Sequence, residues 1–141
     1  MTTKIFVNLP VKDLDKTVEF FTKLGFKFNP QFTDENATCM IIGDDIFVML
    51  LVEKFFKTFT KNEICDTSKN TEVLLALSAD SRENVDQMIK KAIESGGSEH
   101  REPQDHGWMY GCSFQDIDGH IWEIIYMDES AIQKKESDKR S

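Results

Sequence analysis

One pattern of strand and helix signals occurs twice along the chain, and it limits the folds that the chain can adopt. Residues 5–11 read as a strand, and Asp13 has the side-chain type that caps a helix N-terminus. An apolar stripe at helical spacing ends at Gly25 and consists of Leu14, Val18, Phe21 and Leu24. Three strand-like segments come next, at residues 27–32, 37–42 and 46–52. The first part of the chain is therefore predicted to form a β-α-β-β-β module.

The second half of the chain repeats this plan. Residues 72–79 read as a strand, and Asp80 or Ser81 can cap the helix that follows. The second apolar stripe ends at Gly96 and consists of Val85, Met88, Ile89, Ala92 and Ile93. The later strand-like segments lie at residues 98–102, 108–115 and 121–127. These signals predict a second β-α-β-β-β module.

The two modules also align with each other. A shift of about 68 positions superposes Val7 on Leu75 and Phe21 on Ile89, which indicates a weak internal repeat. A chain of 141 residues is long enough for one compact domain but short for two independent ones. We therefore expect a single α+β domain over residues 1–128, with modules at 4–52 and 72–128, a crossover at 53–71, and a polar, frayed tail at 129–141.

Composition excludes several classes of protein. The net charge of −8 opposes attraction to nucleic acid and to anionic lipid, both of which reward clustered Lys and Arg. No apolar run approaches the roughly 20 residues that span a bilayer, and the N-terminus lacks the features of a secretory signal. The three cysteines are odd in number and widely spaced, which argues against a disulfide framework or a thiolate zinc site. We expect a cytoplasmic protein with no nucleic-acid or membrane partner.

The stretch Asp116-Ile117-Asp118-Gly119-His120-Ile121-Trp122-Glu123 combines a tight turn with a carboxylate in an apolar strand. Burying an unpaired carboxylate costs several kcal/mol. Glu123 should therefore have a partner, a raised pKa, a metal ion or a solvated cavity beside it. His120 lies three residues before Glu123, so period-two alternation places the two side chains on opposite faces of the strand.

Three segments resemble the vicinal oxygen chelate superfamily, which includes glyoxalase I, extradiol dioxygenases, and fosfomycin- and bleomycin-resistance proteins. They are Leu9-Pro10-Val11-Lys12-Asp13-Leu14, the stretch from Glu19 to Phe26, and Asp116-x-Asp118-Gly119-x-x-x-Glu123. The stretch from Asp105 to Gly111, with Ser113 to Asp116, resembles a bacterial subgroup labelled predicted lactoylglutathione lyases. The resemblance covers roughly residues 4–128 and implies paired β-α-β-β-β modules that form an open, cup-shaped mixed sheet.

The resemblance also implies where a metal ion would bind. Metal-dependent members hold a divalent ion in the cup with ligands from four strands. The matching positions in this chain are Phe6, Val48 or Met49, Leu74 and Glu123. Only Glu123 is a metal-ligand type, whereas a catalytic ion normally needs three or more protein ligands. We therefore expect the family's metal site to be lost and no cofactor to be bound, with His106 as the candidate replacement ligand.

The remaining site candidates come from strands expected to line the cup. Asn8 is an amide within an apolar strand and should have hydrogen-bond partners or contact a ligand. The other candidates are Met49, His106, Trp108, Tyr110, Cys112 and Glu123. For the Met and the aromatic residues, ordinary core packing is the alternative, and for His106 it is a loop position facing solvent. Glu123 could be a general base, a ligand-orienting acceptor or a hydrogen-bonded relic of a metal site.

Two functions therefore remain open. The first is a metal-free protein that binds a small organic molecule in an aromatic-lined cup, as in the bleomycin-resistance branch. The second is a metal-dependent lyase or dioxygenase of the glyoxalase type, with a non-standard metal site built from Glu123 and His106. The family resemblance also implies a homodimer.

Overall fold

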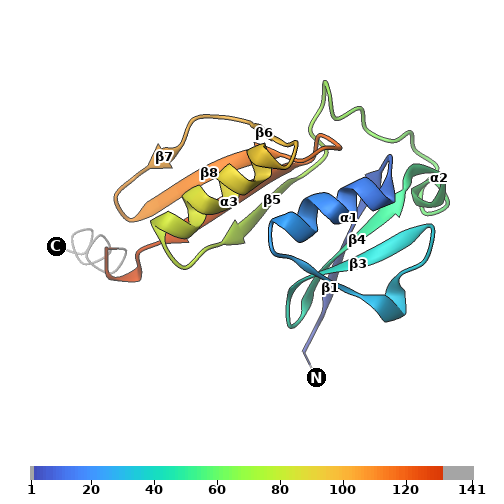
Figure 1. The fold of residues 1–141 in the computed structure, drawn as a ribbon, viewed down its shortest axis with the longest axis horizontal. Helices are drawn as coiled ribbons and strands as arrows, with labels where there is room; N and C mark the ends of the chain where they lie inside the picture. Colours follow the sequence, from blue (N-terminus) through green and yellow to red (C-terminus); the bar gives the residue numbers. More distant parts are fainter. Residues whose placement is uncertain (1, 132–141) are drawn as a thin grey trace. The chain divides into compact units, whose positions relative to one another are not determined.

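The computed structural model describes residues 2–131, and the chain divides after Asn70 into two compact units, unit 1 (up to residue 70) and unit 2 (from residue 71). Each unit contains a mixed β-sheet with one long helix packed along it (Figure 1). This arrangement confirms the predicted α+β class with two modules of similar plan.

Unit 1 has a four-stranded sheet in the order β1-β4-β3-β2. Its strands are β1 (Ile5–Val11), β2 (Lys27–Asn29), β3 (Ala37–Gly43) and β4 (Ile46–Val52). β1 pairs with β4 in parallel, and the other neighbours are antiparallel. The bounds of β1 and β4 are those predicted, because both segments are largely apolar and pair with each other along their whole length.

Helix α1 (Leu14–Lys23) begins as predicted, because the Asp13 carboxylate accepts a hydrogen bond from the backbone N–H of Lys16. Its buried residues are Leu14, Thr17, Phe20 and Phe21, so Leu14 and Phe21 of the predicted stripe are buried, whereas Val18 is partly exposed. Gly25 follows the helix with φ +100°, a backbone conformation that glycine adopts without strain.

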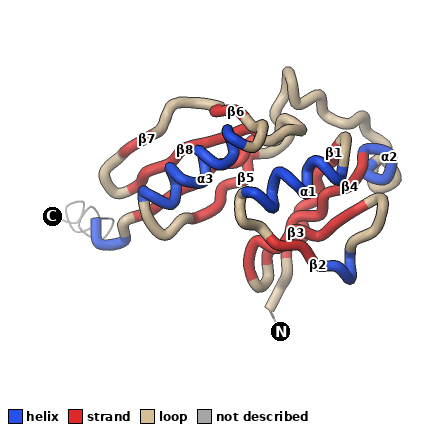
Figure 2. Tube along the Cα trace, viewed as in Figure 1, coloured by secondary structure: helices blue, strands red, loops and turns tan. Residues whose placement is uncertain are grey.

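The predicted strand at 27–32 is wrong in its second half, where β2 gives way to the 3-10 helix η1 (Pro30–Phe32; Figure 2). Pro30 has no N–H to donate to a neighbouring strand. The Asn29 side chain instead accepts a hydrogen bond from the backbone N–H of Gln31 and starts the helical turn. After β4, the crossover contains the short helix α2 (Glu53–Phe56), and Phe55 packs edge-on against Phe59.

The sheet of unit 2 is built around β8 and β9, with β5 beside β9 and both β6 and β7 beside β8. Its strands are β5 (Leu74–Ser78), β6 (Ser98–Glu99), β7 (Gln104–Asp105), β8 (Met109–Gln115) and β9 (Ile121–Met127). β5 pairs with β9 in parallel, and the other pairs are antiparallel. Ser81, rather than Asp80, caps helix α3 (Arg82–Glu94) by accepting from the N–H of Asn84.

The predicted strand at 98–102 is also corrected, because β6 ends at Glu99 and the chain rejoins β8 only at Gln104. Pro103 lies in the interval and cannot donate to the ladder. The predicted tail begins at residue 129; residues 129–131 are helical, and residues 132–141 lie outside the described residues. Among the residues that are described, no helix is long and apolar enough to cross a bilayer.

Candidate functional site

The acid that the turn before β9 buries is Asp116, which is only 5% exposed. Its Oδ1 accepts hydrogen bonds from the backbone N–H groups of Asp118 and His120 at 2.9 and 3.0 Å, and its Oδ2 accepts from Trp122 Nε1 at 2.9 Å. Burial raises the pKa of Asp116, against the opposing effects of His120 and of these hydrogen bonds. Asp116 therefore shapes the turn that presents β9, and its carboxylate oxygens are already occupied.

His120 has a structural environment as well. It is 1% exposed, and its Nδ1 lies 2.6 Å from Oε1 of Glu72, the residue that precedes β5 by two positions. This contact ties the turn before β9 to the start of the neighbouring strand. His120 and Glu123 thus have different partners.

Glu123 has the partner that its position in β9 requires. Its Oε1 lies 2.9 Å from Nη2 of Arg101, and the side chains are 17% and 44% exposed, respectively. In the sheet register, Glu123 stands between Ala76 of β5 and Ser113 of β8. Arg101 was missed by the sequence analysis, because it lies in the irregular segment between β6 and β7 and no spacing rule links it to Glu123.

Ser113, the cross-strand neighbour of Glu123, is the second residue that sequence reasoning missed. Its side chain is fully buried, and its Oγ has no hydrogen-bond partner among the described residues. Its backbone carbonyl accepts a hydrogen bond from the backbone N–H of His100 at 3.3 Å. His100, the residue that follows β6, therefore lies opposite Ser113 of β8. Because directly opposed residues of a sheet share a face, Ser113 and Glu123 project from the same side of it.

Tyr110 and Cys112 occupy the opposite side of the sheet, where α3 packs. Tyr110 Oη donates to Oδ1 of Asp86 in α3 at 2.5 Å, and Cys112 is paired with Ile124 rather than with Glu123. Successive residues of a strand alternate between faces, so Cys112 and Ser113 point in opposite directions. The expectation that Tyr110 and Cys112 line one surface with Glu123 is therefore corrected.

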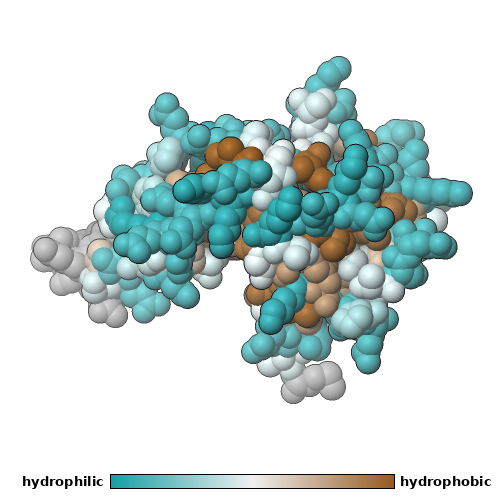
Figure 3. Space-filling view, viewed as in Figure 1, coloured by the Kyte–Doolittle hydropathy of each residue, from teal (hydrophilic) through white to brown (hydrophobic). Residues whose placement is uncertain are grey.

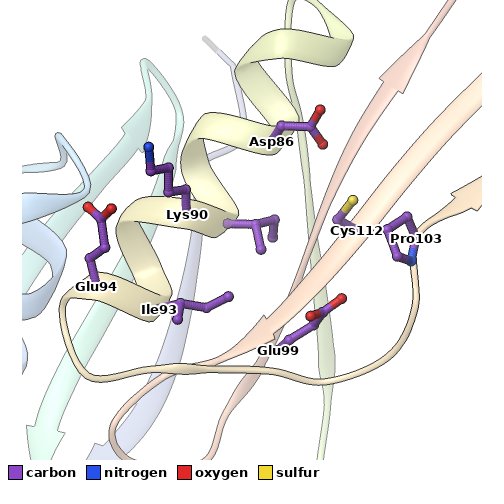
Figure 4. Close-up of a pocket in the computed structure, with 8 residues that line it drawn as sticks. Asp86, Lys90, Ile93, Glu94, Glu99, Pro103 and Cys112 are labelled. Atoms are coloured by element: carbon purple, nitrogen blue, oxygen red, sulfur yellow. The ribbon is translucent and has the colours of Figure 1, made fainter.

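Cys112 lies instead at the base of a groove of about 400 Å³ between α3 and the segment that carries Pro103 (Figure 4). The lining residues are Asp86, Ile89, Lys90, Ile93, Glu94, Glu99, Pro103 and Cys112. Burial raises the pKa of the Cys112 thiol, which opposes formation of the nucleophilic thiolate. The outer surface of α3 is mainly hydrophilic (Figure 3). Cys112 in this groove is therefore not activated as a nucleophile.

His106 and Trp108 lie in the turn between β7 and β8, with their rings stacked at a centroid distance of 6.3 Å. The backbone N–H of His106 donates to the carbonyl of Met109 at 2.8 Å, which closes the turn. Trp108 precedes Ser113 by five residues, roughly 17 Å along an extended strand. The structure therefore does not bring His106 to Glu123, which corrects the idea that it could be a shared metal ligand.

In unit 1, Asn8 and Met49 are directly opposed in the parallel pair of β1 and β4. Phe6 lies two residues before Asn8 and so shares its face of the sheet, while Val48 is 3% exposed on the other face. Of the two alternatives for the acidic position of the family, Met49 is thus the one on the face of Phe6. The Asn8 Nδ2 group donates to the carbonyl of Phe6 at 3.4 Å, a long local hydrogen bond.

The positions that hold a metal ion in related folds do not present suitable donors here. Phe6, Met49 and Leu74 offer two hydrocarbons and one thioether, and the Glu123 carboxylate is already paired with Arg101. Catalytic divalent ions such as zinc, nickel, iron and manganese are held by carboxylate and imidazole ligands in convergent sets of three or more. Across residues 2–131, no group of three His, Cys, Asp or Glu side chains is arranged to hold a metal ion. The residues present therefore do not fit the family's ion.

Comparison with known proteins identifies relatives of this fold. Residues 5–124 match the family described as the Glyoxalase/Bleomycin resistance protein/Dioxygenase superfamily. A hypothetical protein from S. aureus has 33% sequence identity and a TM-score of 0.76, with 89% of this chain and 95% of that chain covered. No curated protein matches the chain.

Two more distant structures share the fold alone. A glyoxalase/bleomycin resistance protein/dioxygenase family enzyme from Burkholderia phytofirmans has 15% identity and a TM-score of 0.74, covering 89% of this chain and 99% of that one. The fosfomycin resistance protein FosX from Mesorhizobium loti has 16% identity and a TM-score of 0.65, covering 89% and 92%.

Proposed function

The chain belongs to the glyoxalase/bleomycin resistance protein/dioxygenase superfamily, and we propose that it binds a small organic molecule without using a metal ion. The observation that carries this proposal is the ion pair between Arg101 and Glu123, whose charged atoms are 2.9 Å apart. A carboxylate neutralised by a guanidinium already has its counter-charge. A cation at Glu123 would have to displace Arg101. Phe6, Met49 and Leu74, which stand at the other family positions, carry no oxygen or nitrogen donor in their side chains.

The proposed binding surface is the face of the unit 2 sheet that points away from α3, which we call the helix-free face. We define it by Leu74, Glu123 and Ser113 with their neighbours in register. Leu74 and Met127 are about half exposed on it, at 55% and 51%. Ligand sites typically combine such apolar walls with a few placed polar groups, here Arg101, Glu123 and Ser113.

Metal analysis tests this proposal. Purified full-length protein would be dialysed against buffer containing nickel, zinc, manganese or iron and then against metal-free buffer, with bound metal measured by mass spectrometry and thermal stability in parallel. We expect substoichiometric metal and no stabilisation. The matched variants are Glu123→Gln and, as a control on an exposed carboxylate of the same unit, Glu102→Gln. One equivalent of metal per chain that is lost in Glu123→Gln and retained in Glu102→Gln would sink the proposal.

That outcome would favour the alternative, a metal-dependent lyase resembling lactoylglutathione lyases, or a dioxygenase. One observation supports keeping it: Arg101 is 44% exposed, so its guanidinium can leave Glu123 without disturbing the core. Glu123 is also the one residue that matches a family ligand.

We further propose that the protein is a cytoplasmic homodimer. Unit 1 exposes large apolar side chains on adjacent strands, including Phe6 and Ile46 at 49% and 47%, and association of two copies would remove such surface from water. Phe6 also stacks on Phe47 with ring centroids 5.0 Å apart. Light scattering at micromolar concentration should give the dimer mass, and a monomer mass would contradict this proposal.

A further inference from the structure

The Ser113 hydroxyl and the Arg101 guanidinium provide hydrogen-bond donors beside the same carboxylate. Resting on the proposed small-molecule function, we infer that the ligand carries a carboxylate or a similar oxyanion, which these two side chains bind together. Ser113 is directly opposed to Glu123 in the sheet, and Arg101 reaches Glu123 Oε1 at 2.9 Å. Both donors therefore lie within one side chain of Glu123 on the helix-free face.

Ser113 is the residue that points to a ligand. A fully buried hydroxyl without a hydrogen-bond partner is unfavourable, and buried polar groups in folded proteins nearly always have one. The Oγ of Ser113 has no such partner among the described residues. An alanine would fit the same space without burying an unpaired hydroxyl, so the contacts within the structure do not explain why a serine stands here. A hydrogen bond from the hydroxyl to an acceptor atom of a bound molecule would explain it.

The contact between Arg101 and Glu123 leaves N–H donors of the guanidinium available. A guanidinium carries five N–H donors in a planar fork that matches the geometry of a carboxylate. The described contact uses Nη2 toward Glu123, and the side chain remains 44% exposed. Glu123 therefore holds the guanidinium in place without using all of its donors. Because part of the side-chain entropy is already lost in that ion pair, less remains to be lost when a second carboxylate binds.

The local charge favours an oxyanion over an organic cation. The Glu123 carboxylate is neutralised by Arg101, whereas the Ser113 hydroxyl has no hydrogen-bond partner among residues 2–131. His100 lies opposite Ser113 in the sheet and adds an imidazole beside Ser113 and Glu123. The net charge of −8 opposes anions at long range, but salt screens separations beyond about 10 Å at 0.1 M ionic strength. The contacts at the site therefore decide which ligands bind.

The surrounding side chains indicate the rest of the ligand. Leu74, which is opposed to Ile121 in the register, is about half exposed on β5, the strand beside β9. Contact with an apolar body would remove this surface from water. An aromatic or branched aliphatic acid combines such a body with the oxyanion.

Three probes of one shape distinguish the charge classes: benzoate, benzamide and benzylamine. Binding of each to the full chain would be measured by NMR titration at neutral pH and millimolar probe concentration. We expect benzoate to bind at least tenfold more tightly than the other two. Ser113→Ala and Arg101→Gln should each weaken benzoate binding about tenfold, the effect of one lost hydrogen bond of about 1.4 kcal/mol.

The matched control is Arg82→Gln, which removes the exposed ion pair between Arg82 and Asp105 and should leave benzoate binding unchanged. Arg101→Lys retains the charge without the fork and should give an intermediate affinity. Amide spectra of each variant would show that it is folded.

Four results would overturn the inference. The first is that benzamide or benzylamine binds as tightly as benzoate, and the second is that neither Ser113→Ala nor Arg101→Gln changes the affinity for benzoate. The third is that Arg82→Gln weakens benzoate binding as much as these two variants, and the fourth is that benzoate does not bind. In the first case the protein still binds small molecules without a metal ion, so the proposed function survives. Failure of the proposed function is recognised separately, by stoichiometric metal that depends on Glu123.

Discussion

Trp122 Nε1 donates a hydrogen bond of 2.9 Å to Oδ2 of Asp116, and both side chains are buried. The other oxygen of the carboxylate accepts from two backbone N–H groups of the same turn. One side chain therefore satisfies three donors at the point where the chain enters β9. Since β9 carries Glu123, this turn also fixes the position of the candidate site.

Removing the Asp116 carboxylate should destabilise the protein strongly. Asp116→Ala leaves the indole N–H and the buried N–H of His120 without acceptors, and we expect the free energy of unfolding to fall by about 2–4 kcal/mol. Urea denaturation measures the change. Asp66→Ala is the matched control, because Asp66 accepts from Ser68 in a similar turn on the surface. Similar losses for both variants would contradict the structural role of Asp116.

Ser113→Ala should instead stabilise the protein. The substitution removes a buried hydroxyl that has no partner among the described residues, so we expect the free energy of unfolding to rise by about 1 kcal/mol. The control is Thr38→Val, since Thr38 is equally buried but its Oγ1 lies 2.9 Å from Oγ1 of Thr33. That variant should lose about 1 kcal/mol. Destabilisation by Ser113→Ala would show that the hydroxyl has a structural partner in solution.

Most of the fold could be predicted because local signals agree with the tertiary structure. The strands at 5–11, 46–52 and 121–127 are apolar runs, and Asp13 caps a helix as its residue type predicts. Two of the errors in strand extent, at residues 30–32 and 100–102, occur beside Pro30 and Pro103. There, a missing N–H outweighs the strand propensity of the neighbouring residues.

The candidate site was less predictable, for two physical reasons. Cys112 and Ser113 are both buried, so alternation along β8 cannot tell which residue faces α3. The partner of Glu123 is Arg101, which is distant in sequence and lies outside the regular part of β6. An ion pair between a loop and a strand has no periodic signature. Glu123 itself was found because a carboxylate is unusual in an apolar strand.

Asp105 should titrate at unusually low pH. Its carboxylate accepts two hydrogen bonds from Arg82 and one from the N–H of Gly107, which lowers its pKa from 3.8 to about 2. The folded-state pKa lies below the unfolded one, so this contribution to stability is present above about pH 4 and is lost as the pH falls toward 2. Carboxyl-carbon NMR should show the low pKa.

In Arg82→Gln, the pKa of Asp105 should move back toward 3.8, because the hydrogen bonds from the guanidinium are its largest cause. Asp66 is the internal control: its pKa is lowered mainly by Ser68 and should not respond to the substitution. A pKa of Asp105 that stays near 2 without Arg82 would contradict the assignment.

Gly25→Ala should be costly although the space around Gly25 is empty. No atom lies within 4 Å of the position of an added Cβ, but the φ of +100° is one that L-residues rarely adopt. We expect a loss of about 1–2 kcal/mol from backbone strain. Gly43→Ala is the control, since Gly43 has an ordinary φ and the nearest atom, Ile46 Cδ1, is at 3.7 Å. Equal losses for the two variants would show that packing, rather than φ, decides the cost.

The ion pair between Arg101 and Glu123 should show measurable coupling in solution. In a double-mutant cycle with Arg101→Gln and Glu123→Gln, we expect a coupling free energy of about 1 kcal/mol, because the Glu123 carboxylate is mostly shielded from solvent. The exposed helical pair of Glu19 and Lys23 is the control and should give about 0.3–0.5 kcal/mol.

High salt should reduce the coupling of the exposed pair more than that of Arg101 and Glu123, since screening acts through solvent. The cycle also bears on function, because the absence of a metal ion is proposed on the ground that Arg101 supplies the counter-charge of Glu123. A coupling near zero would mean that the guanidinium does not occupy the carboxylate in solution, and Glu123 would then be available as a ligand for a cation.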